Sequence, residues 1–217
     1  RNPDRYATGG GYDDRDARDE FFWAAAELYL TTGDASYRAD LEASPGWNAD
    51  LYMQDGFSWQ QVAPFAALEL ARHADRLDAA AAAHWRAALQ AGADKLLALQ
   101  QAEGFGLAYT PGDGTYAWGS NAQVLANAQV LATAADILGI TAYRAAAIES
   151  MDYILGRNGI GQSYVTGYGT KFSQNQHSRW FAHARDSRLP HPPHGALAGG
   201  ANSALQDPVM QSRFGAM

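Results

Sequence analysis

The residues best suited to chemistry are His177 and Arg179, which lie two positions apart near the end of the stretch SYVTGYGTKFSQNQHSRW, residues 163–180. In an extended backbone, residues i and i+2 point to the same side, so both side chains would share one face. Arginine offers a rigid fork of hydrogen-bond donors, and histidine has a tip that donates and accepts. The pair suits recognition of hydroxyl or carboxylate groups.

Aromatic residues accompany this pair, namely Tyr164, Tyr168 and Trp180. Aromatic faces beside hydrogen-bonding tips suit a sugar, whose C–H faces stack on rings while its hydroxyls form hydrogen bonds. On the spacing of His177 and Arg179 alone, an exposed polar loop is the better interpretation. The rings shift the balance toward a carbohydrate site.

Carboxylates gather at Asp13, Asp14, Asp16, Asp19 and Glu20. They could supply a catalytic carboxylate pair of the kind that cleaves glycosidic bonds, or a Ca²⁺ site built from hard oxygen ligands. Taken alone, the cluster is better explained as a helix start with acidic residues in the first turn, and its spacing does not match an EF-hand loop.

The other histidines carry no metal-binding spacing. His183, His191 and His194 lie in a proline-rich stretch and are expected at the surface, whereas His73 and His84 fall on helices, where they pack or are exposed. The sequence contains neither a glycine-rich phosphate loop nor a nucleophile elbow.

Composition narrows the class of protein. With 217 residues, 47% apolar and 18% charged, the chain can bury a sizeable core. A net charge of −7 argues against nucleic acid and favours a neutral polymer or small molecule. The absence of cysteine excludes disulfides and cysteine-based zinc sites, no apolar run is long enough for a membrane span, and no signal peptide is visible.

The sequence predicts a set of helices, and these helices must position the candidate site residues. Apolar periodicity predicts helices near 19–32, 59–74, 78–101, 120–138 and 141–156. The expected N-caps are Asp16, Ser58 and Ser120, and the expected stops are Gly33, Gly139 and Gly156. Pro64 either kinks the second helix or delays its start.

Short connections predict antiparallel helical hairpins in one all-α domain over residues 1–217, helical over 16–156. Residues 157–207 are expected to be loops, and loops of this length usually carry function.

At this level of detail the sequence resembles family 9 of the glycoside hydrolases, the inverting cellulases. Positions of that family's histidine signature are matched by Ser163, Val165, Thr166, Gly169, Lys171, His177 and Arg179. Four further segments resemble family segments in the same order: GYDDRDARDEFFWAAAELYLTTGD, YAWGSN, MDYILGRN and ALAGGANSALQDP. The resemblance covers essentially the whole chain.

Three positions depart from the family pattern. Gln176 stands where proline usually precedes the signature histidine, Ser178 where a second histidine is common, and Ala201 where the family has the proline of GGPN. These departures put the rigidity of the loop and one substrate contact in question. The family's catalytic-base motif and its general-acid motif are both absent from residues 1–217, so the resemblance implies that this chain alone is inactive.

The resemblance implies an (α/α)6 toroid, of which this chain supplies about half, and inverting hydrolysis of β-1,4-glucans without a cofactor for the chemistry. His177 and Arg179 would hydrogen-bond sugar hydroxyls beside the scissile bond, and Tyr168, Trp118 and Trp180 would contact the sugar. Two alternatives stay open: an exo-acting relative on short or chitosan-derived oligosaccharides, and an inactive or carbohydrate-binding remnant.

The resemblance also implies a structural Ca²⁺ ion near Asp19 and Glu20, although a third family carboxylate is replaced near Gln60 or Gln61. The most similar subgroup carries an immunoglobulin-like module before the catalytic domain. Resemblance to its members implies an extracellular or periplasmic location.

Overall fold

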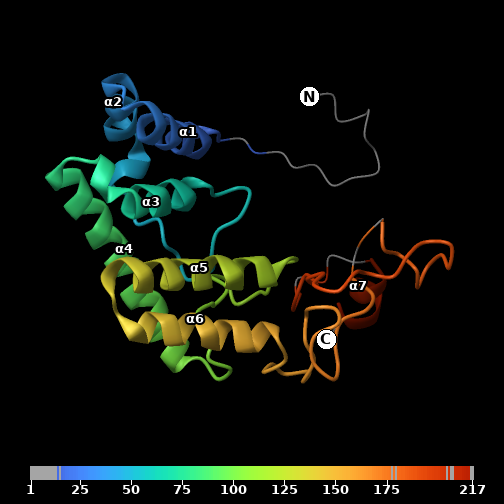
Figure 1. Ribbon diagram of the computed structural model, residues 1–217. Coiled ribbons are helices and arrows are strands. Elements are labelled where there is room, and N and C mark those ends of the chain that lie inside the picture. The colour runs from blue at the N-terminus through green and yellow to red at the C-terminus, as the bar shows by residue number, and fades with distance from the viewer. Residues whose placement is uncertain are drawn as a thin grey trace, which may run out of the picture.

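A computed structural model describes residues 14, 16–176, 178, 180–203, 205 and 208–215. Its helical elements are α1 (Arg18–Thr32), α2 (Ala35–Ala43), η2 (Pro45–Asn48), α3 (Ala63–Arg72), η3 (Ala74–Arg76), α4 (Ala79–Ala102), α5 (Ser120–Leu138), α6 (Thr141–Ile154) and α7 (Pro208–Phe214). Figure 1 shows them in chain order. Predicted residues Asp13, His177 and Arg179 lie outside the described part.

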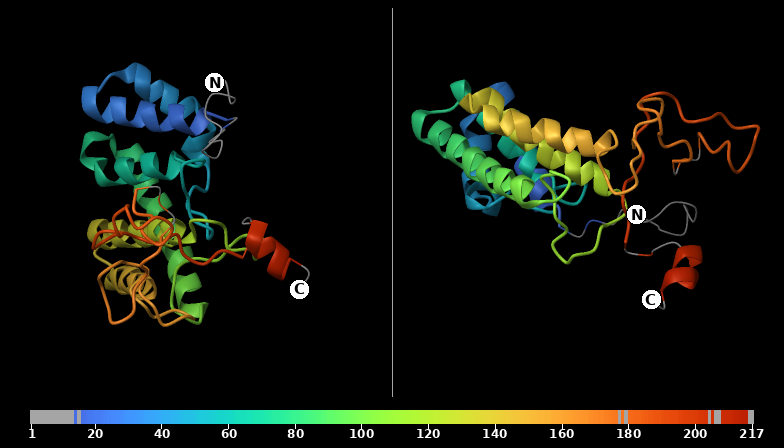
Figure 2. Two further views of the ribbon diagram at one scale, coloured as in Figure 1. Left: turned by 90° about the vertical axis from the view of Figure 1, so that its right-hand side faces the viewer. Right: turned by 90° about the horizontal axis from the view of Figure 1, so that it is seen from below.

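The first six α-helices form three consecutive hairpins, α1–α2, α3–α4 and α5–α6 (Figure 1). Helix α1 packs on α3 and α3 on α5, while α4 packs on α6. The pairs follow one another from top to bottom in the left view of Figure 2. One helix of each hairpin therefore lies in an inner row and the other in an outer row, which confirms the expected half of a six-hairpin toroid.

Local signals place most helix ends where the sequence predicts them. Gly33 and Gly139 end α1 and α5 in the left-handed conformation, with φ of 73° and 71°. The Asp78 carboxylate accepts a hydrogen bond from Ala81 N at 2.9 Å and caps α4. Directly after Gly33, the short helix α2 is capped by Asp34, which accepts from Ser36 N at 2.8 Å.

One predicted helix start, the three predicted N-caps and one predicted stop are wrong by small margins. Helix α3 begins at Ala63 rather than near residue 59, because Pro64 is tolerated only in a first turn, where its missing N–H has no partner to lose. Ser58 is therefore no cap. Helices α1 and α5 begin after Ala17 and Gly119, so neither Asp16 nor Ser120 occupies the N-cap position. Helix α6 ends at Ile154, two residues before the predicted stop.

The core lies between the two rows of helices. Its largest fully buried side chains include Phe22 of α1, Leu68 of α3, Trp85 and Leu89 of α4, and Leu131 of α5. Burial of these apolar side chains is the main stabilising term for such a helical array. His84 belongs to this packing: its ring stacks on Trp47 at 5.4 Å, and its Nε2 lies 2.8 Å from Trp47 O.

From residue 157 to residue 203 the described chain is irregular, with the isolated bridges Ser163–Phe172 and Val165–Leu197. Figure 1 shows this segment beyond the end at which α5 begins, away from the α5–α6 turn. The predicted loop region is therefore gathered at one end of the hairpins.

Candidate functional site

The signature segment forms a closed loop held by its own main chain. Ser163 N donates to Lys171 O at 2.9 Å, and Ser173 N donates back to Ser163 O at 2.9 Å. Thr166, which is almost fully buried, donates through Oγ1 to Ser173 O at 2.8 Å. The loop is thus a defined structure although it contains no regular strand or helix.

A second loop segment, residues 195–203, joins the signature loop to the start of α5. On one side, Thr166 N donates to Ala196 O at 3.0 Å. On the other side, Asn121 N donates to Gly199 O at 3.0 Å, and Ser120 Oγ donates to Ala201 O at 2.7 Å. Three segments that resemble the family are therefore bonded together in space: the signature, ALAGGANS and YAWGSN.

The rings predicted to contact sugar are exposed at this end of the molecule. Tyr168, Trp118 and Trp180 expose 56%, 59% and 80% of their surface. Tyr168 lies in the turn that follows Val165, and Trp118 lies directly before α5. Tyr164 is different: it is buried, packs on Tyr153 with ring centroids 5.8 Å apart, and belongs to the core. Its predicted place among the sugar-facing rings is therefore wrong.

His177 and Arg179 lie outside the described residues, and their predicted role stays a prediction. A cavity of about 510 Å³ is lined by their neighbours in the chain, namely Asn175, Gln176 and Ser178. Amide and hydroxyl groups at this cavity match the kind of surface that binds hydroxyl-rich ligands.

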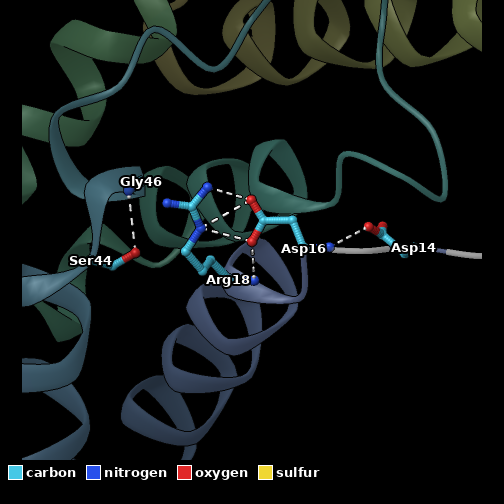
Figure 3. Close-up of polar contacts among 5 residues, drawn as sticks. All are labelled: Asp14, Asp16, Arg18, Ser44 and Gly46. Atoms are coloured by element: carbon cyan, nitrogen blue, oxygen red, sulfur yellow. Dashed lines mark hydrogen bonds and ion pairs between the residues drawn. The ribbon is translucent and has the colours of Figure 1, made fainter.

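The acidic cluster at the start of α1 is divided between two different environments. Asp16 forms a forked ion pair with Arg18, whose Nε lies 2.7 Å from Asp16 Oδ1, and Asp14 accepts from Asp16 N at 2.9 Å (Figure 3). The hydrogen bonds from Arg18 lower the pKa of Asp16 to about 2. Asp16 is therefore an ionised, paired surface carboxylate and no proton donor.

Asp19 and Glu20 face inward instead. Asp19 Oδ2 accepts from Val62 N at 2.7 Å and so connects the start of α1 to the start of α3. Glu20 Oε2 is buried without a hydrogen-bond partner, and a hydrogen bond shared with Asp19 raises the pKa of Glu20. Two carboxyl groups this close are stabilised by a shared proton or by a cation.

The surroundings of Asp19 bear on the predicted ion. Asp19, Gln60 and Gln61 line one cavity of about 360 Å³, so the two glutamines lie where the resemblance puts a third carboxylate. No three Asp, Glu or His side chains of the described chain gather closely enough to hold a metal. Amide oxygens are also calcium ligands, but only Asp19 of the two predicted carboxylates lines this cavity together with the glutamines.

The remaining histidines of the late loops form no site of their own. The rings of His183 and His191 are in contact, with centroids 3.8 Å apart and planes tilted by 31°, and His183 Nδ1 lies 2.8 Å from Leu189 O. Exposed His191 and His194 match the surface positions expected for them.

Sequence reasoning missed the residues that hold the loops. Asn121 and Gln176 connect loop segments through their side-chain amides, and Ser178 accepts from Trp180 N and Phe181 N at 3.1 and 3.2 Å. Gln176 and Ser178 stand out in the sequence as departures from the family pattern. What they contact depends on residues far away in the chain.

The half-toroid of helical hairpins, with its long loops gathered at one end, agrees with the fold that the family resemblance implies. The sequence profile of glycosyl hydrolase family 9 matches residues 1–214, and the chain belongs to this family. Endoglucanase C of Cellulomonas fimi is 47% identical over 208 residues, which cover 95% of this chain and 19% of that protein. The xyloglucan-specific endo-β-1,4-glucanase BoGH9A of Bacteroides ovatus is 35% identical over 91% of this chain and 33% of its own length.

Solved structures of family 9 enzymes support the same family assignment. The family 9 endoglucanase J30 superimposes with a TM-score of 0.80 at 32% identity, over 94% of this chain and 36% of that one. AaCel9A, solved with cellobiose-like isofagomine, gives a TM-score of 0.81 at 29% identity, over 99% of this chain and 39% of its own. The chain therefore spans about a fifth to two fifths of the relatives it matches. None of the described helices is long and apolar enough to cross a membrane.

Proposed function

We propose that these residues work within a longer family 9 catalytic domain that hydrolyses β-1,4-glucosidic bonds of cellulose or cellodextrins by inversion. The observation that carries this proposal is the family match over residues 1–214, together with relatives named as endoglucanases and a cellobiosidase. In the proposal, His177 and Arg179 bind sugar hydroxyls beside the scissile bond, while Tyr168, Trp118 and Trp180 stack on the chain. The family's base and acid carry the proton transfers and need no cofactor.

An inverting mechanism makes a stereochemical prediction. The attacking water enters opposite the leaving group between two carboxyl groups about 6.5–9.5 Å apart, so a β-linkage yields an α-product first. We expect α-anomeric ends in the proton NMR spectrum when cellohexaose is mixed with residues 1–217 extended by flanking coding sequence that contains both carboxylate motifs. Residues 1–217 alone are the control and should release no sugar. Release of the β-anomer first would exclude inversion, and an extended protein inert on cellodextrins would exclude the proposed function.

We also propose that Asp19 and Glu20 help to hold a structural Ca²⁺ ion, with Gln60 or Gln61 as a weaker ligand. An ion that binds only the folded state stabilises it by mass action, by about 2.7 kcal/mol when free Ca²⁺ is a hundred times its dissociation constant. Chelation should therefore lower the melting temperature of the extended domain.

The matched variants are Asp19→Ala and Glu20→Gln. Asp19→Ala also loses the hydrogen bond from Val62 N, so it should melt at a lower temperature with or without chelator. Glu20→Gln keeps the shape of the side chain and removes its charge. Both variants should lose the response to chelator, and a wild-type domain whose melting curve does not respond would exclude the ion.

Cellulose is a polymer too large to enter a cell, so we propose that the enzyme acts in the extracellular or periplasmic space. Cell fractionation followed by assay of each fraction tests this, and activity confined to the cytoplasm would contradict it. The immunoglobulin-like module outside residues 1–217 remains a prediction, and sequencing of the flanking coding region tests it.

A further inference from the structure

Gln176, the residue directly before His177, has a side-chain amide at the centre of the loop network. Its Nε2 group donates to Thr166 Oγ1, to Ala196 O at 3.0 Å and to Ser173 O at 3.3 Å. Its Oε1 atom is buried and has no hydrogen-bond partner among the described residues. The two hydrogens of this amide are shared among three oxygens, two in the signature loop and one in segment 195–203, which gives the side chain a defined place.

The segments that Gln176 contacts are themselves fixed. Thr166 N donates to Ala196 O at 3.0 Å, the same oxygen that accepts from Gln176. Thr166 Oγ1 donates to Ser173 O at 2.8 Å. Beyond Ala196, the chain is bonded to the start of α5 through Gly199 O. The main chain at Gln176 is therefore connected, through a short series of hydrogen bonds, to a helix of the scaffold.

The chain on the other side of His177 is also held. Ser178 Oγ accepts from Trp180 N at 3.1 Å and from Phe181 N at 3.2 Å, which closes a turn. His177 is thus flanked in sequence by two residues whose side chains bind backbone groups. Gln176 and Ser178 both line the cavity of about 510 Å³ described above.

We propose that Gln176 is a positioning residue for His177. The inference rests on the proposed function, because it assigns His177 a contact with substrate. Proline restricts a loop by fixing its own φ, whereas glutamine here restricts it through hydrogen bonds from its amide to its own loop and to Ala196 O. The departure from the family pattern therefore replaces one way of holding the loop by another.

The test uses the extended domain on cellohexaose, with Gln176→Met as the main variant. Methionine keeps the volume of glutamine but cannot donate, so the loop keeps its packing and loses the hydrogen bonds of the Gln176 amide. Misplacement of a substrate-binding group by about 1 Å can cost a hundredfold in rate, so we expect kcat/KM to fall about ten- to a hundredfold, mostly in kcat. Wild-type kinetics in this variant would overturn the proposal.

A double-mutant cycle separates positioning from general stability. If Gln176 acts through His177, then Gln176→Met should change kcat/KM less than about twofold in a His177→Ala background. Additive losses of kcat/KM in the double variant would overturn the proposal. A loss of kcat/KM in Gln176→Met would also overturn it if His177→Ala alone keeps wild-type kinetics. In that last case the substrate-binding role proposed for His177 fails as well, whereas additive losses leave it intact.

The matched control is Gln162→Ala. Gln162 also directs its amide to Ser173, at 3.3 Å, but reaches the hydroxyl group and lies fourteen positions before Gln176 in the chain. Its kinetics should remain those of the wild type. A loss in Gln162→Ala equal to that in Gln176→Met would show a general effect of loosening Ser173 and would overturn the specific role of Gln176.

Discussion

Replacement of His177 or Arg179 by alanine is expected to lower kcat/KM of the extended domain on cellodextrins by about 1–3 kcal/mol of transition-state stabilisation, or roughly 5- to 150-fold. The physical reason is the loss of one hydrogen bond to a sugar hydroxyl, which is worth more when the donor is a charged guanidinium. The melting temperature should stay close to that of the wild type, because a side chain that binds substrate contributes little to the core.

Two surface residues of the same loop region provide controls. Arg188 is 88% exposed and pairs with Asp186, a type of ion pair that contributes little, so Arg188→Ala should leave kinetics unchanged. His191→Ala removes an exposed ring that contacts His183 and should also have no kinetic effect. Wild-type kinetics in both His177→Ala and Arg179→Ala would return the pair to the exposed polar loop that their spacing alone suggests.

The second large effect is expected at Gly200, where the loop segment 195–203 meets α5. Gly200 has φ of 97°, and a Cβ atom there would lie 2.5 Å from Asn121 Oδ1 and 2.7 Å from Ser120 Oγ. Asn121 cannot move away easily, since it is fully buried and its Nδ2 donates to Ala198 O at 2.9 Å. Gly200→Ala therefore combines backbone strain with overpacking, and we expect it to destabilise the domain by about 2–4 kcal/mol.

Urea unfolding measures this effect, and Gly195→Ala is the matched control. Gly195 has a similar φ of 89°, but no atom lies within 4 Å of its added Cβ. It should cost only the strain of a left-handed alanine, about 1 kcal/mol. Activity should fall further in Gly200→Ala, because the signature loop depends on this segment for its attachment to α5. Equal midpoints for the two variants would mean that the contact with Asn121 has no energetic importance.

The sequence alone determined the features that depend on neighbours in the chain. Helices α1 and α5 end at Gly33 and Gly139, because a left-handed glycine stop is a local effect. Apolar residues at helical spacing identified the faces that now form the core. The signature residues, read in order, identified the family, and the short connections implied antiparallel hairpins.

Only the tertiary structure decided which of several similar residues are buried, exposed or bonded across the loops. Tyr164 and Tyr168 lie four positions apart, yet one packs in the core and the other is largely exposed, because the first lies opposite Tyr153. Ser120 looks like a helix cap and instead donates to Ala201 O, and Gln176 looks like a defect of the signature and instead joins the signature loop to segment 195–203. These outcomes depend on partners far away in sequence, and the local pattern of a loop carries no information about them.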